Sequence, residues 1–519
     1  MNPSVTSEHT HSVWMGVDMP TARTLNEDTA TEVCIIGSGI AGLSTAYRLL
    51  QEGKSVVVLE SGTLGSGMTP LTTAHLSHVM DRGLSTIERL HGEQGTRLAV
   101  RSHTAAIEWI EDTAAKESIP CGFERVDGYL FAPFDSPAHQ IEEEWAAARR
   151  AGLTNVTRYD SAPLLPFPTG PCLRFTRQAQ FHPMRYLSGL ARAIQQKGGR
   201  LFANAHVTEV DAKPRVSVKT RDGRQVSADA VVVTTNTPIN NTVTLHTKQA
   251  PYTTYVIGAG IAAGSIPKAL YWDTEDPYHY VRVHTETVGG SEQTVLIVGG
   301  EDHKTGQAED GERRYAALET WMRARFPMAK DVLFSWSGQV METIDGLAYI
   351  GRNPGDSNVY VATGDCGMGM THGTIAGLLL SDLIMDRPSP WASLYDPSRQ
   401  RMKAAGTFLA ESLNVAAQYG DWLTRGDVPS EQDIPVDGGA VLRDGLHKIA
   451  AYRDREGVLH QCSAVCPHLA CIVAWNRSQK TWDCPCHGSR FDRFGKVLNG
   501  PATSNLTPLP DRSKSTPSS

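Results

Sequence analysis

The apolar positions of the chain fall into segments whose spacing predicts alternating strands and helices. An apolar run over residues 31–36 (TEVCII) predicts a buried strand, residues 44–51 continue as a helix, and residues 54–60 (KSVVVLE) predict a second buried strand. A strand, a helix and a strand in this order form a βαβ unit. We therefore expect an α/β domain near the start of the chain.

The later segments contain both the alternating pattern of strands and the helical pattern. β-Branched and aromatic residues alternate over 252–300, which predicts an antiparallel sheet. The other predicted elements are helices over 61–125, 187–196, 311–326 and 374–385, and strands over 127–133, 207–233 and 359–363.

Changes in polarity and in the predicted secondary structure divide the chain into five parts. Residues 1–30 are polar and irregular, 31–387 carry the mixed helix and strand pattern, and 388–429 form a polar, partly helical connector. Residues 430–511 have short strands and turns, and 512–519 are typical of a frayed tail. We expect a large α/β and α+β unit followed by a smaller all-β domain.

Composition narrows the functional classes. Lys and Arg number 49 against 56 Asp and Glu, a net charge of −7 over 519 residues, which argues against a nucleic-acid-binding surface. No apolar run is long enough for a membrane span, and the N-terminus lacks the pattern of a secretory signal. We therefore expect a cytoplasmic protein.

The cysteines are unevenly placed. Five of the nine lie between residues 462 and 486. Because cytoplasmic thiols are kept reduced, this grouping favours a metal site over a disulfide framework.

The first glycine-rich segment has the pattern of a dinucleotide-binding turn. Gly37, Gly39 and Gly42 form GxGxxG between a predicted strand and a predicted helix. The first glycine permits a tight turn, the second lets the backbone approach a pyrophosphate, and the third allows close helix packing. The helix start presents free N–H groups to phosphates, and Glu60 can hydrogen-bond ribose hydroxyls. We predict a nucleotide site here.

Two further segments favour FAD over NAD. A glycine-rich stretch over 362–373 follows a strand and precedes a helix, and residues 65–77 can supply a third wall. Two separated backbone cradles suit a long cofactor. A third glycine motif over 256–263 is followed by Pro267 and no helix, so we interpret it as a strand and not as an NADPH site.

These segments resemble the glycine-oxidase and D-amino-acid-oxidase superfamily of FAD-dependent oxidoreductases. The matching stretches are VCIIGSGIAGLSTAYRLL, ADAVVVTTN, DGLAYIG and VATGDCGMG, within residues 30–385. The resemblance implies a Rossmann-type FAD-binding domain interleaved with an α+β substrate subdomain, and oxidation of a C–N bond by hydride transfer to the flavin. The FAD-binding residues that it implies are Gly37, Gly39, Ile40, Ala41, Gly42, Glu60, Ser61, Thr73, Ala74, His75, Val207, Thr235, Gly364, Gly367, Met368, Gly369, Met370 and Thr371.

A second chemical signal lies in the C-terminal part. Cys466 and His468 form a CxH pair, fifteen residues intervene, and Cys484 and His487 form a CxxH pair. Thiolates and imidazoles at this spacing could bind zinc, although zinc ribbons more often use CxxC. A Rieske [2Fe–2S] centre needs two Cys on one iron and two His on the other, and two such loops supply them.

Residues 430–511 resemble Rieske domains. The resemblance assigns Cys466 and Cys484 to one iron and His468 and His487 to the other. It also implies a disulfide between Cys471 and Cys486, and a proline loop at residues 500–502 that covers the cluster.

One position departs from high-potential Rieske proteins, which hydrogen-bond the cluster with a Ser and a Tyr. Ser489 keeps the first donor, but Phe491 occupies the Tyr position. Losing a donor disfavours the reduced cluster, so we predict a lower potential.

The combination of FAD and a Rieske cluster predicts a converter from two-electron to one-electron chemistry. A substrate would give a hydride to FAD, and single electrons would pass through the cluster to an external acceptor protein. Two alternatives stay open: a reductase or monooxygenase in which the cluster delivers electrons from an external donor, and a non-catalytic redox sensor.

The substrate is predicted to be an amine and not a simple α-amino acid. Relatives that oxidise amino acids bind the carboxylate with an Arg, and Val340 stands at that place. A secondary or tertiary amine, a polyamine conjugate or a cyclic imine fits better. His75 could link to the flavin, but a packing or pyrophosphate-side role is favoured. The candidate pocket residues are Tyr255, Tyr280, Arg282, His303 and Gln339.

Overall fold

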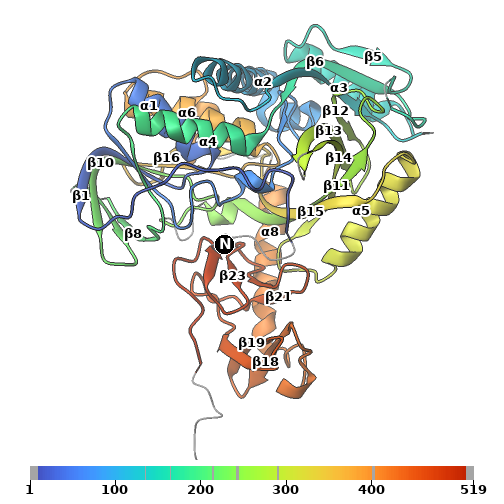
Figure 1. The fold of residues 1–519 in the computed structure, drawn as a ribbon. Coiled ribbons are helices and arrows are strands. Elements are labelled where there is room, and N and C mark those ends of the chain that lie inside the picture. The colour runs from blue at the N-terminus through green and yellow to red at the C-terminus, as the bar shows by residue number, and fades with distance from the viewer. Residues whose placement is uncertain are drawn as a thin grey trace, which may run out of the picture.

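The computed structural model describes residues 10–134, 136–163, 165–212, 215–240, 245–288, 291–399 and 404–509. Figure 1 shows two sheets with their covering helices in the upper part and a smaller strand-rich domain below them. The expected fold class, an α/β domain interleaved with an α+β subdomain and followed by an all-β domain, is confirmed.

The first sheet has the order β16-β17-β10-β1-β2-β7, with β8 and β9 beside β10. β1 is parallel to both β2 and β10, and the chain leaves β1 toward one side and returns on the other. Such a switch in direction opens a crevice at the carboxyl ends of the strands. The strands are β1 (Thr29–Ile36), β2 (Val56–Leu59), β7 (Arg200–Phe202), β8 (Val207–Asp211), β9 (Val216–Thr220), β10 (Gln225–Val233), β16 (Tyr349–Arg352) and β17 (Val359–Thr363).

Helices α1 (Ile40–Gln51), α4 (Pro183–Gln196) and α6 (Gly369–Ile384) pack against this sheet, and α2 (Leu84–Lys116) packs on α6. α6 begins five residues before the predicted start at residue 374. Its glycines permit close contact with α1, because a Cβ at Gly373 would lie 2.6 Å from Ile40 Cγ2. Residues 369–373, the last part of the glycine-rich stretch, therefore belong to the helix.

The second sheet is mixed, with the order β15-β11-β14-β13-β12-β4-β6-β3 and β5 beside β6. Strands β11 to β14 pair antiparallel where they neighbour one another, as the alternation over 252–300 predicts. Most of the glycine motif at 256–263 lies in β11. The strands are β3 (His75–Leu76), β4 (Glu124–Phe131), β5 (Thr157–Tyr159), β6 (Cys172–Gln180), β11 (Gln249–Ile261), β12 (Leu270–Asp273), β13 (His279–Val288), β14 (Ser291–Lys304) and β15 (Val332–Thr343). The helices are α3 (His139–Arg150), which packs against α2, and α5 (Gly311–Arg325), which packs on β11 and β14.

The described part of the N-terminal segment is packed and not loose. Trp14 is fully buried, and its indole Nε1 donates to the carbonyl oxygen of Thr72 at 2.6 Å. Arg23 forms a β-bridge with Phe202. The mostly polar sequence of residues 1–30 does not predict these contacts, because they depend on only a few residues.

The C-terminal domain holds a three-stranded and a four-stranded sheet. Helix α8 (Ala405–Gln418) runs between this domain and the second sheet (Figure 1). The remaining elements are α7 (Ala392–Tyr395), β18 (Gly438–Asp444), β19 (His447–Arg453), β20 (Leu459–Ser463), β21 (Ala474–Asn476), β22 (Thr481–Asp483), β23 (Arg490–Asp492), β24 (Val497–Asn499) and the 3₁₀ turns η1 (Thr69–Leu71), η2 (His246–Lys248), η4 (Tyr419–Leu423) and η5 (Glu431–Asp433).

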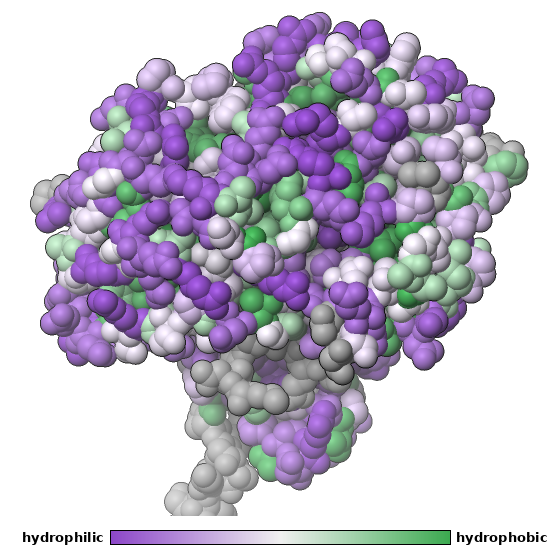
Figure 2. Space-filling model, turned by 45° about the horizontal axis from the view of Figure 1, so that its top comes forward, coloured by the Kyte–Doolittle hydropathy of each residue, from purple (hydrophilic) through white to green (hydrophobic). Residues whose placement is uncertain are grey.

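The surface carries mostly hydrophilic residues with apolar ones scattered between them on the face that Figure 2 presents. Across the described residues, no helix combines the length and apolar character that a bilayer crossing requires.

Candidate functional site

The first glycine turn lies at the carboxyl end of β1, where the sheet changes direction. Gly37 has a φ of +105°, and a Cβ there would lie 2.6 Å from the carbonyl oxygen of Thr234. A Cβ at Gly42 would lie 1.9 Å from the carbonyl oxygen of Gly37, so only glycine fits. Helix α1 begins at Ile40 after the N-cap residue Gly39 and has no side-chain cap. The N–H of Ile40 donates to Thr69 Oγ1 at 3.2 Å, which leaves other N–H groups of the first turn for an anion.

Glu60 is held at the end of β2. Its Oε2 accepts hydrogen bonds from the backbone N–H and the hydroxyl of Ser38, at 2.9 and 2.7 Å. The carboxylate also lines the cavity beside the glycine turn. It is fixed in the place where the ribose of a bound dinucleotide is expected.

The second glycine segment faces the same cavity. Gly364 and Gly367 have φ of +74° and +73°, a conformation that favours glycine. Helix α6 also starts without a side-chain cap. Two uncapped helix starts therefore face one cavity, as the FAD prediction requires.

Most of the predicted FAD-binding residues line this cavity. The described members are Gly37, Gly39, Ile40, Ala41, Glu60, Ser61, Thr73, His75, Val207, Thr235, Gly364, Gly367, Met368, Gly369 and Met370. Three others lie behind it: Gly42 packs between helix and strand, the carbonyl oxygen of Ala74 accepts from Arg282, and Thr371 Oγ1 is 2.8 Å from His103 Nδ1.

The candidate pocket residues separate into two groups. Tyr280 and Gln339 line the cavity. Tyr255 and His303 stack on each other in the core beneath the second sheet, with ring centroids 5.7 Å apart. Arg282 is 1% exposed and donates to the carbonyl oxygens of Thr73 and Ala74. The alternation predicted that this segment forms a sheet, but not which face of the sheet borders the cavity.

His75 occupies the wall predicted for it. Its Nδ1 lies 3.1 Å from Thr73 Oγ1, and its ring meets that of Tyr280 edge to face at 5.7 Å. Burial, with the charge of Arg282, lowers the pKa of His75 to about 3. The imidazole is therefore neutral at physiological pH.

Acidic side chains border the cavity. Among the described residues that line it, the acidic side chains are Glu60, Asp81 and Asp365, and none is Lys or Arg. The hydroxyl of Tyr278 lies between two carboxylates, 3.2 Å from Asp81 Oδ2 and 3.1 Å from Asp302 Oδ2. Desolvation by the surrounding protein, then the charges of Glu342 and Asp302, raise the pKa of Asp81 to about 8.

Sequence reasoning missed this acidic group. Asp81 comes from a loop before α2, Tyr278 from the residue just before β13, and Asp302 from near the end of β14. No motif joins these positions, because only the second sheet brings them together. In the sequence, only Asp81 lies near a segment that was predicted to border the cofactor, residues 65–77.

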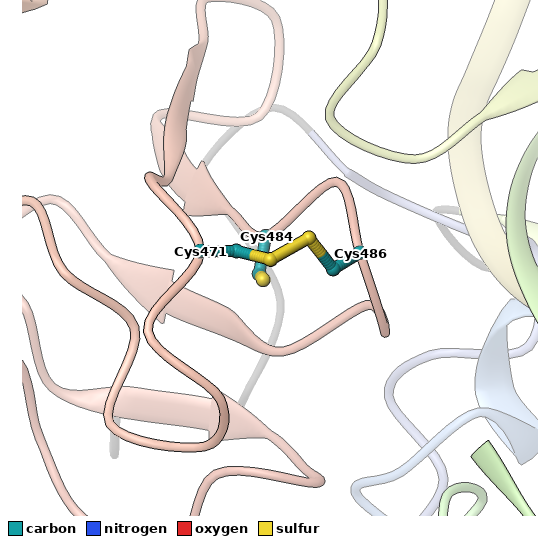
Figure 3. Close-up of side chains that lie close together, drawn as sticks. All are labelled: Cys471, Cys484 and Cys486. Carbon is teal, nitrogen blue, oxygen red and sulfur yellow. A yellow bond between two sulfur atoms is a disulfide. The ribbon is translucent and has the colours of Figure 1, made fainter. Parts of the chain in front are cut away.

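The predicted cluster ligands lie on two loops of the C-terminal domain. Cys466 and Cys484 are buried free thiols, and the rings of His468 and His487 are 5.1 Å apart and nearly perpendicular. Cys471 and Cys486 form a disulfide that links the loops, the pairing that the resemblance implies (Figure 3).

These four side chains suit an iron–sulfur cluster. Both ring nitrogens of His468, and Nδ1 of His487, are buried and lack hydrogen-bond partners within the described part of the chain. Burial lowers the pKa of each histidine to about 4, which keeps the imidazoles neutral, the form that binds metals. Buried polar atoms without partners are costly, so a bound group explains them.

The histidine side of these loops faces the FAD-binding part of the chain. The ring of His246, in η2, lies 4.8 Å from that of His468 and 5.7 Å from that of His487. Residues 497–500, 502 and 503, from β24 and the proline loop, line the same cavity as the glycine turns. The cavity is therefore built by both domains.

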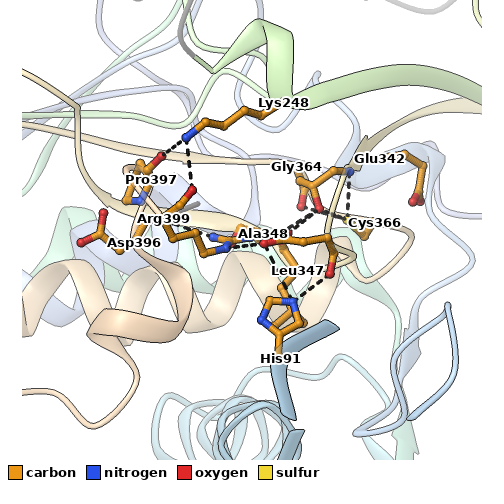
Figure 4. A network of polar contacts seen from close by, with 12 residues as sticks. His91, Lys248, Glu342, Leu347, Ala348, Gly364, Cys366, Asp396, Pro397 and Arg399 are labelled. Atoms are coloured by element: carbon orange, nitrogen blue, oxygen red, sulfur yellow. Dashed lines mark hydrogen bonds and ion pairs between the residues drawn. The ribbon is translucent and has the colours of Figure 1, made fainter. Parts of the chain in front are cut away.

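A buried polar network supports the second glycine segment from behind (Figure 4). Arg399 donates to both carboxylate oxygens of Asp345, at 2.7 and 2.8 Å, and to the carbonyl oxygen of Ala348. Although burial opposes it, the Arg399 guanidinium lowers the pKa of Asp345. Lys248 Nζ donates to the carbonyl oxygens of Pro397 and Arg399, so the connector is fixed to the FAD-binding domain.

Cavity and loops together define a flavin-dependent oxidoreductase with an attached iron–sulfur domain. The chain belongs to the FAD dependent oxidoreductase family, which it matches over residues 32–383, and residues 426–510 match the Rieske [2Fe-2S] domain. Its cofactors are accordingly FAD and a [2Fe–2S] cluster.

The similarity to one relative spans nearly the whole length of both chains. The chain is 31% identical over 514 residues to the putative Rieske 2Fe-2S iron-sulfur protein YhfW of Bacillus subtilis, covering 97% of this chain and 98% of that protein. It is 27% identical over 375 residues to the gamma-glutamylputrescine oxidoreductase of Escherichia coli, covering 70% of this chain and 85% of that protein.

The fold of the FAD-binding part is shared with solved structures. Glycine oxidase from Geobacillus kaustophilus aligns with a TM-score of 0.59 at 18% identity, over 72% of this chain and 99% of that one. L-proline dehydrogenase from P. horikoshii aligns with a TM-score of 0.58 at 18% identity, over 72% of this chain and 98% of that one.

Proposed function

We propose that the protein oxidises a C–N bond of a cationic amine and passes the electrons singly to an external acceptor protein. When bound, FAD accepts a hydride and the Rieske cluster carries one electron at a time. The observation that carries the proposal is the shared cavity, which both glycine turns and residues 497–500 of the Rieske domain line. A flavin cavity that residues of the Rieske domain help to line supports internal transfer.

The charge of the cavity supports an amine as the substrate. An α-amino acid would bring a carboxylate into a cavity whose described lining has carboxylates but no Lys or Arg. Val340, at the position where the resemblance predicts a carboxylate-binding Arg, belongs to that lining. A protonated amine would meet no cation there, and Asp81, once ionised, would pair with it. The name of the Escherichia coli relative, gamma-glutamylputrescine oxidoreductase, also supports an amine-type substrate.

Asp81 is proposed as the group that takes the amine proton. An amine must lose its ammonium proton before it can lose a hydride, and a base works best when its pKa lies near the working pH. The pKa of Asp81, raised to about 8, meets this condition. Tyr278 holds Oδ2 of Asp81 in place by a hydrogen bond of 3.2 Å.

The test is anaerobic mixing of the holoprotein with monoamines, diamines and α-amino acids. We expect amines to bleach the flavin absorbance, followed by the EPR signal of a reduced Rieske cluster, and amino acids to do neither. Bleaching by amino acids alone would contradict the substrate class. Absence of bleaching by any amine, with the cluster accepting electrons from a reducing protein, would favour the reverse direction of flow.

A further inference from the structure

A single side chain connects the flavin cavity to a cluster-binding loop. Gln339, on β15, is 3% exposed and lines the cavity. Its Nε2 donates to the carbonyl oxygen of Gly488 at 2.9 Å, and its Oε1 accepts from Asn236 Nδ2 at 3.2 Å. Gly488 directly follows His487, a predicted cluster ligand. The amide therefore has one partner in each domain.

The hydrogen bonds continue to the second glycine segment. The hydroxyl of Thr363 donates to the carbonyl oxygen of Asn236 at 2.7 Å, and Thr363 directly precedes Gly364. Asn236 has a φ of +64°, a conformation that Asn tolerates better than most residues. An unbroken chain of contacts thus runs from the cradle at Gly364 through Asn236 and Gln339 to the cluster loop.

We propose that Gln339 is a positioning residue for internal electron transfer, and not a contact for the substrate. It holds the loop of His487 against the wall of the flavin cavity, and Asn236 orients its amide. A buried amide with both ends satisfied fixes one geometry, because breaking either bond leaves a buried polar atom without a partner. This proposal rests on the proposed function.

The electron balance of the coupled steps is simple. Each transfer oxidises the reduced flavin by one electron and reduces the cluster by one, and an external one-electron acceptor empties the cluster between transfers. Two transfers, with release of one proton to water, account for the hydride that the substrate gave.

The chain offers a matched control. Gln307 makes the same kind of interdomain bond, since its Nε2 donates to the carbonyl oxygen of Pro485 at 3.3 Å on the same cluster loop. Gln307 is absent from the cavity lining. Gln307→Met therefore removes a docking bond to this loop, together with the bonds between Gln307 and Asn414, without touching the flavin wall.

The experiment uses the holoprotein under anaerobic conditions, with flash-photoreduced deazaflavin as the electron source. Visible absorbance follows the rate at which the electron redistributes between flavin and cluster. EPR of the reduced cluster and the flavin spectrum show that both cofactors are bound. The variants are Gln339→Met, Asn236→Gly and the control Gln307→Met; glycine tolerates the positive φ at position 236.

We expect Gln339→Met and Asn236→Gly to slow redistribution by about tenfold or more, with unchanged EPR and flavin spectra, and Gln307→Met to change it by less than about twofold, because small misplacement of reacting groups is costly. An unchanged rate in Gln339→Met, or equal slowing in Gln307→Met, would overturn the proposal. So would loss of either cofactor in both Gln339→Met and Asn236→Gly, which would show a purely structural role. If the wild-type protein redistributes no electron at all, the proposed function itself fails.

Discussion

Charged and polar single residues set the chemistry of the cavity. Asp81 is an ordinary aspartate in sequence, and its environment alone makes it a candidate base. The surrounding protein desolvates it, Glu342 and Asp302 add negative charge, and Tyr278 and Arg82 oppose them only in part. The net result is a carboxyl group that is largely protonated below pH 8.

A pH profile tests this assignment. Above about pH 8 Asp81 is ionised and can accept the amine proton, so kcat/KM for an amine should rise as pH increases through 8. Asp81→Asn should lower kcat/KM by about 10²-fold and remove that limb of the profile. Asp365→Asn, which alters another carboxyl group of the cavity, should leave the rise of kcat/KM through pH 8 unchanged. A limb that persists in Asp81→Asn would assign the base elsewhere.

A second single position sets the predicted potential of the cluster. Ser489 is fully buried beside the ligand loop and its hydroxyl accepts from the N–H of Ala502 at 3.0 Å, while Phe491 has no donor. Phe491→Tyr should raise the midpoint potential by about 60 mV, since a hydrogen bond to a charged group is worth about 1.5 kcal/mol and 59 mV is about 1.4 kcal/mol for one electron.

Voltammetry of the holoprotein measures this shift. Phe494→Tyr is the matched control, because Phe494 belongs to the same domain but is 55% exposed. Equal potentials in wild type and Phe491→Tyr would show that position 491 does not control the cluster.

At the scale of elements, the connector is a structural part of the molecule. Residues 396–399 join the network behind the second glycine segment through Arg399. Helix α8 then joins both domains: Glu411 pairs with Lys304 at 2.7 Å, and Tyr419, just after the helix, donates to the carbonyl oxygen of Leu469 in a cluster loop. The polar sequence of this connector hides these contacts.

Removal of the Arg399 guanidinium should destabilise the FAD-binding domain. Arg399→Met leaves the Asp345 carboxylate buried without its cation, which costs about 3–5 kcal/mol. Arg323→Met removes an exposed pair with Glu319 and should cost less than about 0.5 kcal/mol. Denaturant midpoints followed by flavin fluorescence compare the two, and equal midpoints would contradict a structural role for the network.

At the scale of the whole molecule, the two domains meet at close range. A Cβ at Gly488 would lie 2.6 Å from both Pro251 Cβ and Gln339 Nε2 of the FAD-binding part, and a Cβ at Gly306 would lie 2.9 Å from the backbone of Pro485. Such contacts leave no space for a larger residue on either side. The Rieske domain is thus fitted to this surface and not merely tethered to it.

Gly488→Ala should loosen this interface. Gly488 and Gly457 both have positive φ, +79° and +84°, so alanine strains the backbone equally, but a Cβ at Gly457 meets nothing within 4 Å. Hydrogen exchange in β11 and in the loop after Cys484 should accelerate in Gly488→Ala and stay unchanged in Gly457→Ala. Equal exchange in both variants would show that the contact is not tight.

The sequence by itself determined the parts of this protein. The GxGxxG turn with Glu60, the second glycine segment and the CxH and CxxH pairs are local patterns, because each needs only a few neighbouring residues to form its geometry. They predicted the fold class and both cofactors, which the family matches confirm. The binding roles of the individual residues stay predictions.

The tertiary structure alone decided how the parts face one another. Asp81, Tyr278 and Asp302 meet where a loop before α2 packs against the paired strands β13 and β14, and Gln339 meets Gly488 through domain contact, 149 positions along the chain. Tyr255, Arg282 and His303 matched the pattern of pocket residues but lie in the core or behind the wall. Alternation along a strand fixes which side chains share a face, whereas packing between sheets and domains decides what that face borders.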